Sequence, residues 1–149
     1  MGHSNFSIGA EFYVMSKLLL NNIPTFKSYT NQEGFDLICI NSVSNISVTI
    51  QVKSNSSIND YSFWLNKRTN IKPDFYIFLN TKIVHGKGKA KSFVFTNEPE
   101  IFIFPIRIIK RNRRHRVDNK KNHYFLLSDK NYRKKYQNNF DQIKDVLGL

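Results

Sequence analysis

Three polar residues of complementary chemistry, Asp36, Gln51 and Lys53, stand at the ends of two apolar segments. These segments, residues 35–40 and 46–53, have the length of β-strands and are separated by a short polar turn, a pattern typical of a β-hairpin. Apolar and polar residues alternate in the second segment. Gln51 and Lys53 are therefore expected on the same face of that strand.

The turn fixes where the acid lies relative to the amide and the lysine. If the turn centres near Val43, antiparallel pairing places Asp36 opposite Ile50 or Gln51. An acid, an amide and a lysine would then converge at one end of the hairpin. Oxygen ligands beside a cation could hold a divalent metal ion against a phosphate group.

A helix is predicted before the hairpin, with Ser7 as its N-cap. The apolar residues that recur at helical spacing are Ile8, Phe12, Met15, Leu18 and Leu19. Glu11 borders this stripe, and a buried carboxylate is costly unless it is paired, which Lys53 or a metal ion would achieve. Alternatively, Glu11 begins the polar flank of the helix and faces water. Considered together with Asp36 and Lys53, Glu11 is expected at the site.

With these residues in this order, the chain resembles the PD-(D/E)XK nuclease superfamily over roughly residues 6 to 80. Its core is a helix, three antiparallel strands, a helix and a further strand. Asp36 matches the acid at the start of the second strand, Lys53 the lysine of the third, and Glu11 the helix glutamate of many members. Gln51 departs from the pattern because it replaces the second acid. A glutamine at this position resembles the Mrr-type restriction branch.

The resemblance implies an α/β, restriction-endonuclease-like fold, a catalytic set of Glu11, Asp36, Gln51 and Lys53, and Mg²⁺ or Mn²⁺ as cofactor. Asp36, the Gln51 side chain and the Val52 backbone carbonyl would hold the metal ion. Lys53 would orient the attacking water and stabilise the transition state, and Glu11 would hold Lys53 or a metal-bound water. The implied function is a metal-dependent endonuclease that acts on DNA.

Composition agrees with a nucleic-acid partner. Lysine and arginine total 23 against 11 acids, which gives a net charge of +12. Such an excess is typical of polyanion binding. The predicted phosphate-contacting residues are Lys67 and Arg68, together with a basic segment, residues 107–121, that contains Arg107, Lys110, Arg111, Arg113, Arg114, Arg116, Lys120 and Lys121. The alternative is a solvated basic surface.

Two rival functions stay open. One is a non-catalytic nucleic-acid-binding module on a degenerate nuclease fold, which Gln51 favours. The other is an RNA-directed or toxin-like nuclease on the same scaffold. The four histidines lack metal-ligand spacing, and the single cysteine, Cys39, lies between isoleucines and is expected in the core.

The remaining sequence predicts a single domain over residues 1–149, because 149 residues with 40% hydrophobic content can bury one core. Further predicted elements are a helix or irregular strand at 61–70, strands at 74–79, 92–96 and 101–104, a helix beginning at Pro105 and a C-terminal helix at about 129–147. No apolar run approaches the ~18 residues of a membrane span, and no signal peptide is recognisable. A cytoplasmic protein that binds double-stranded DNA, as a monomer or a homodimer, is expected.

Overall fold

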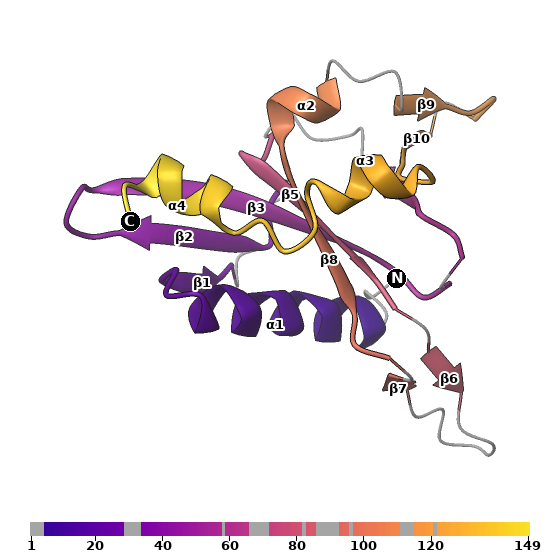
Figure 1. The fold of residues 1–149 in the computed structure, drawn as a ribbon, viewed down its shortest axis with the longest axis horizontal. Coiled ribbons are helices and arrows are strands. Elements are labelled where there is room, and N and C mark those ends of the chain that lie inside the picture. Colours follow the sequence, from indigo (N-terminus) through magenta and orange to yellow (C-terminus); the bar gives the residue numbers. More distant parts are fainter. Residues whose placement is uncertain are drawn as a thin grey trace.

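The computed structural model describes residues 5–28, 34–57, 59–65, 72–81, 83–85, 93–95, 97–110, 115–120 and 122–149. In chain order the elements are α1 (Asn5–Leu20), β1 (Thr25–Lys27), β2 (Leu37–Asn41), β3 (Ile46–Asn55), β4 (Ser62–Leu65), β5 (Phe75–Asn80), β6 (Ile83–His85), β7 (Phe93–Phe95), β8 (Glu100–Pro105), α2 (Ile106–Lys110), β9 (His115–Val117), β10 (His123–Leu126), α3 (Lys130–Lys134) and α4 (Asp141–Leu147). The fold is a mixed α/β arrangement (Figure 1).

A five-stranded sheet with the order β1-β2-β3-β5-β8 forms the centre of the molecule. The first three strands form an antiparallel meander, β3 pairs with β5 in parallel, and β5 pairs with β8 in antiparallel orientation. All six residues of β5 are buried. The sheet is therefore covered on both faces at β5, as expected for a central strand with a continuous apolar sequence.

Two apolar clusters lie on the opposite faces of this sheet. The first joins α1 and α4 to residues such as Ile50, Val52 and Ile77. The second contains Tyr76 and Phe78, together with residues of β4, β8 and β10. Because side chains alternate along a strand, neighbouring residues of β5 contribute to different clusters. Gln51 and Lys53, which alternate with Ile50 and Val52, point to the side of the second cluster.

The buried stripe of α1 differs from the prediction. Ala10, Val14 and Leu18 are fully buried, at a spacing of four residues, whereas Ile8 and Phe12 are 40% and 47% exposed. Leu19 is 46% exposed, so of the predicted stripe Leu18 is the fully buried residue and Met15 is partly buried. The helix carries apolar residues on more than one side. Contact with β3 and β1 therefore selects the side with the smaller residues, which permits a closer approach to the sheet.

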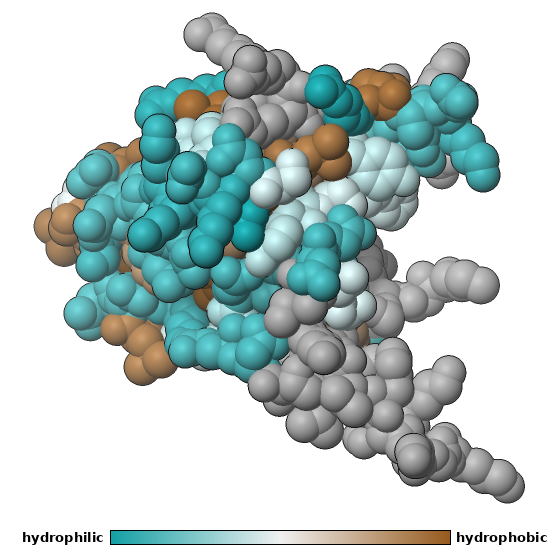
Figure 2. All heavy atoms as spheres, turned by 45° about the vertical axis from the view of Figure 1, so that its right-hand side comes forward, coloured by the Kyte–Doolittle hydropathy of each residue, from teal (hydrophilic) through white to brown (hydrophobic). Residues whose placement is uncertain are grey.

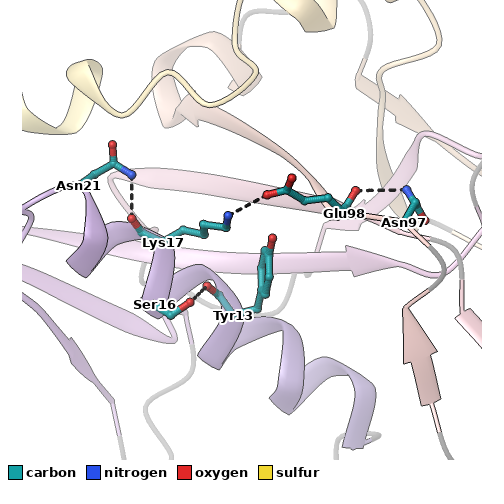
Figure 3. Close-up of polar contacts among 6 residues, drawn as sticks. All are labelled: Tyr13, Ser16, Lys17, Asn21, Asn97 and Glu98. Carbon is teal, nitrogen blue, oxygen red and sulfur yellow. Dashed lines mark hydrogen bonds and ion pairs between the residues drawn. The ribbon is translucent and has the colours of Figure 1, made fainter.

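Polar contacts attach α1 to the chain before β8. Lys17 Nζ lies 2.8 Å from Glu98 Oε1 (Figure 3). At the end of the helix itself, the Lys17 carbonyl accepts a hydrogen bond from Asn21 Nδ2 at 2.8 Å. The Glu98 side chain is 76% exposed. Solvent-exposed ion pairs of this kind contribute little to stability, so the buried stripe is what holds α1 in place.

The C-terminal helix predicted at 129–147 is wrong as a continuous element. Two short helices, α3 and α4, replace it. The residues between them pair with β8: the Asn138 amide donates to the Ile101 carbonyl at 3.0 Å, and Asn138 has a φ of 50°. The helix α3 has already ended at Lys134, the left-handed Asn138 turns the chain, and the pairing with β8 replaces the hydrogen bonds that a continuous helix would have made.

The other predicted strands agree with β5, β7 and β8, and the helix predicted after Pro105 agrees with α2. The segment predicted at 61–70 forms β4 at residues 62–65, and residues 66–71 lie outside the described part. The helix of the implied core between its third and fourth strands is not seen in the described residues 59–65. Within the described chain, no helix is long and apolar enough to span a membrane.

Candidate active site

The β2–β3 hairpin has the predicted register. Leu37 pairs with Ile50, and the Asp36 amide donates to the Ile50 carbonyl at 2.8 Å. The next position of the antiparallel register therefore places Asp36 opposite Gln51. The prediction that the acid and the amide face each other at the end of the hairpin is confirmed.

The Asp36 carboxylate is held directly against β3. Its Oδ2 atom accepts hydrogen bonds from Gln51 Nε2 at 2.6 Å and from the Val52 amide at 2.7 Å. Burial raises the pKa of Asp36, and the negative charge of Glu11 acts in the same direction. The hydrogen bond from Val52 and the positive charges of Lys53 and Lys27 oppose this rise. The carboxyl group therefore sits in a partly desolvated site among charged neighbours.

Lys53 belongs to the same electrostatic cluster. Burial lowers the pKa of Lys53, while attraction to Asp36 and Glu11 partly restores it. Burial also raises the pKa of the Tyr76 hydroxyl, and the charge of Asp36 adds to the effect. Tyr76 is the partner of Gln51 across the β3–β5 ladder. Glu11, Asp36 and Lys53 therefore act on one another electrostatically, Gln51 is hydrogen-bonded to Asp36, and Tyr76 lies within range of the Asp36 charge.

Glu11 is buried, with only 8% exposure, so the alternative of a solvent-facing glutamate is wrong. Its ion-pair partner is Lys27 on β1, whose Nζ lies 2.7 Å from Glu11 Oε2. Lys27 Nζ also donates to the Asp36 carbonyl at 3.2 Å. Direct pairing of Glu11 with Lys53, one of the expected arrangements, is replaced by the pair with Lys27. Lys53 still feels the charge of Glu11.

Sequence reasoning missed Lys27. It lies on a three-residue strand, which is too short to show an alternating pattern. In the structure Lys27 pairs with Leu37, the residue that follows Asp36, and this pairing brings its ammonium group to the Asp36 backbone carbonyl.

Replacing Lys27 with methionine should destabilise the fold by about 3 kcal/mol, because it leaves the Glu11 carboxylate buried without its cation. Equilibrium urea unfolding of the variant and the wild type measures this loss. The matched control is the double variant Lys27→Met/Glu11→Gln, which removes both charges and should recover most of the stability. If the single and double variants were equally unstable, the ion pair would not be the source of the loss.

The donor atoms around Asp36 fit a hard, oxygen-binding cation. Asp36 supplies a carboxylate, and the Gln51 amide can present its oxygen by rotation about its last side-chain bond. The Val52 amide points to Asp36, and in an extended strand the carbonyl of the same residue points to the same edge. Among the described residues, no three histidine, cysteine, aspartate or glutamate side chains form a metal-binding group. A metal ion would therefore depend on Gln51 and the backbone to complete its ligands.

Cys39 is buried and fully inaccessible, as predicted. Burial raises the pKa of its thiol to about 11. The thiolate needed for nucleophilic chemistry is therefore disfavoured, and Cys39 is a core residue.

Four of the predicted phosphate-contacting residues are described, and all four are exposed: Arg107, Lys110, Arg116 and Lys120. They lie on α2, on β9 and in the turn after β9. The others, Lys67, Arg68, Arg111, Arg113, Arg114 and Lys121, lie outside the described residues. Hydrophilic side chains cover most of the described surface in the view of Figure 2, interrupted by separate small apolar patches.

The fold is similar to that of one solved bacterial homing endonuclease. The solved structure of a bacterial homing endonuclease, I-Ssp6803I, superposes with a TM-score of 0.59 and covers 97% of this chain and 94% of that chain, at 14% sequence identity. At this identity the likeness establishes the fold alone. No family model matches the chain, and no curated protein matches its sequence.

Proposed function

We propose that this chain is a metal-dependent endonuclease that hydrolyses phosphodiester bonds in DNA, with a site of the PD-(D/E)XK type. The observation that carries the proposal is the buried cluster at the end of the β2–β3 hairpin, where Asp36 contacts Gln51 and shares its electrostatic environment with Lys53 and Glu11. The similarity of the whole fold to a homing endonuclease supports a nuclease.

In this proposal, Asp36, the Gln51 oxygen and the Val52 carbonyl hold Mg²⁺, with Mn²⁺ as a substitute. The bound metal ion would supply Lewis acidity, which favours hydroxide formation and neutralises charge on the phosphate. Lys53 donates a hydrogen bond to the phosphate oxygen on which negative charge develops. The Glu11–Lys27 pair holds the Asp36 backbone in place through the bond from Lys27 to the Asp36 carbonyl.

The desolvation of Lys53 strengthens its proposed role. A partly buried ammonium group interacts with a developing phosphate charge at lower effective dielectric than a solvated one. It needs no reorganisation when the reaction begins, since its strand is in the middle of the central sheet.

DNA is the proposed substrate because the charge of the chain is strongly positive. The net charge is +12, and the four described basic residues of the basic segment are exposed. Exposed cations attract phosphates and release condensed counterions on binding.

Incubation of the purified protein with plasmid DNA and Mg²⁺ tests the proposal. Nicked or linear products should appear, and a chelator should prevent their formation. The same assay with structured RNA distinguishes a DNA-directed from an RNA-directed nuclease.

The second candidate is a nucleic-acid-binding module without catalysis. One observation favours it: Gln51 Nε2 donates to Asp36, so the amide satisfies the carboxylate without a metal ion. The two candidates predict different results in the same experiment. A binding module would retard DNA in a gel-shift assay and leave it uncut with Mg²⁺ and with Mn²⁺.

A further inference from the structure

A three-stranded antiparallel sheet, with the order β4-β10-β9, lies outside the central sheet. One face of this small sheet packs against the central sheet: Phe63 on β4 and Phe125 on β10 are buried and contact Phe78 of β5. Phe63 and Phe125 are cross-strand partners. Since side chains alternate, the residues next to them must point to the outer face.

That outer face carries a row of two aromatic residues and a cation. Tyr124 pairs with Trp64 on one side and with Arg116 on the other, so the three side chains lie next to one another across the strands. Trp64 is 55% exposed, Tyr124 is partly exposed and Arg116 is exposed. Trp64 is the single tryptophan of the chain. Large exposed aromatic side chains on a sheet face indicate a contact with a partner.

The start of β4 is joined by hydrogen bonds to β3, the strand that carries Gln51 and Lys53. Asn55 lies two residues after Lys53 on the same face of β3, a separation of roughly 7 Å along the strand. Its Nδ2 donates to the Ser62 carbonyl at 3.1 Å and to the Asp60 carbonyl at 2.9 Å. Asn80 Nδ2 also donates to the Asp60 carbonyl, at 3.1 Å. These bonds attach the start of β4, two residues before Trp64, to the ends of β3 and β5.

The charges near the row favour a polyanion. Arg116 belongs to the row and Lys120 is exposed in the turn that follows β9, within a segment that carries eight basic residues and one acid. The acid, Asp118, accepts hydrogen bonds from the amides of Lys120 and Asn122 and from the Tyr124 side chain, so its charge is shared among donors of the turn and of the row. A second copy of the chain would present the same positive charge to this face. Nucleic acid is therefore the partner that the charges fit.

We propose that Trp64, Tyr124 and Arg116 form a stacking platform for unpaired bases of the nucleic acid that the candidate active site cleaves. The proposal rests on the proposed function and specifies its substrate as DNA that contains unpaired nucleotides. Aromatic faces bind bases by stacking, and in a continuous duplex those base faces are already occupied by neighbouring base pairs. Arg116 adds a planar cation that can stack on a base or contact a phosphate.

The fluorescence of Trp64 provides a direct test, because no other tryptophan contributes. Gapped or single-stranded DNA is added in the presence of a chelator, which prevents cleavage. We expect this DNA to quench the Trp64 fluorescence, and the quenching should give the same dissociation constant as the anisotropy of labelled DNA. A blunt duplex should bind with a much smaller change. Trp64→Ala should weaken binding to gapped DNA by about 10-fold, in the range measured for base–aromatic stacking, and Trp64→Phe should retain most of it.

Two matched controls separate stacking from general effects. Phe12→Ala removes an aromatic residue of similar exposure from α1 and should leave DNA affinity unchanged. Arg116→Ala should weaken binding more than Lys144→Ala, which removes the same charge from α4. Circular dichroism should show the same fold for all variants.

The outcomes distinguish this proposal from the proposed function. If gapped DNA binds and is cut with Mg²⁺ but Trp64 fluorescence and the Trp64→Ala affinity do not change, the platform is refuted and the nuclease stands. If Trp64→Ala lost the same affinity for gapped DNA as for blunt duplex, Trp64 would contact a groove or the backbone, and stacking would also be refuted. Self-association that disappears in Trp64→Ala would assign the face to a second copy instead. An absence of DNA binding would refute both proposals.

Discussion

Replacing Lys53 with methionine is expected to slow metal-dependent DNA cleavage by ~100-fold or more, the loss typical of removing one preorganised transition-state donor. DNA affinity should stay close to that of the wild type, because Lys53 is partly buried and contributes little to the exposed basic surface. Methionine keeps the volume of the aliphatic chain, so the packing beside Phe78, the cross-strand partner of Lys53, is preserved. Single-turnover cleavage rates with saturating protein, beside anisotropy measurements, separate the two effects.

The matched control is Lys134→Met, which removes the same charge from an exposed position on α3. It should leave the cleavage rate unchanged. Burial lowers the pKa of Lys53 below its usual 10.5. The cleavage rate of the wild type should therefore decrease at alkaline pH as Lys53 loses its proton, and this decrease should begin at a lower pH than for a solvent-exposed lysine. Equal rates for Lys53→Met and the wild type would exclude Lys53 from catalysis.

Replacing Asp36 with asparagine should abolish metal binding and cleavage while making the fold more stable at neutral pH. Burial raises the pKa of Asp36 above its usual 3.8, so the folded protein holds this proton more tightly than the unfolded chain does. The stabilisation from the protonated form is complete below the ordinary pKa and is lost as pH rises through the raised pKa. Asparagine carries no charge at any pH and can still accept the hydrogen bond from the Val52 amide.

Urea unfolding from acidic to neutral pH tests this prediction. The two proteins should have similar stability at acidic pH, and the advantage of Asp36→Asn should grow toward neutrality. Asp60→Asn is a control of opposite sign, because hydrogen bonds from Ser62 lower the pKa of Asp60 and favour its charged form. A constant stability difference between Asp36→Asn and the wild type across this range would contradict the linkage. Isothermal titration with Mn²⁺ measures the loss of metal binding.

The parts of the site that could be predicted are those that depend on local sequence. The alternation of residues 46–53 and the turn near Val43 determine the hairpin register, which places Asp36 beside Gln51. Glu11 was located by its position next to an apolar stripe, although the buried stripe proved to contain Ala10 and Val14. The sequence predicts that α1 is a helix. It does not predict which side of the helix is buried, because apolar residues lie on several sides and only contact with the sheet distinguishes them.

The parts that could not be predicted depend on contacts between distant segments. β4 pairs with β10, about 60 residues later in the chain, through a register that local periodicity does not specify. The break between α3 and α4 similarly follows from pairing with β8, which competes with helix formation at Asn138. Lys27 reaches Glu11 only because β1 forms the edge of the central sheet.

The position of the four catalytic candidates along the chain has a consequence for evolutionary change. All of them lie between α1 and β3, whereas Tyr124 and Arg116 lie on strands that follow β8. A recombination or insertion event after Asn55 can therefore exchange the surface that we propose selects the substrate and leave the candidate catalytic groups in place. Substitutions that alter substrate preference are expected in the strands after β8. The first third of the chain, which carries the candidate catalytic residues, is expected to change less.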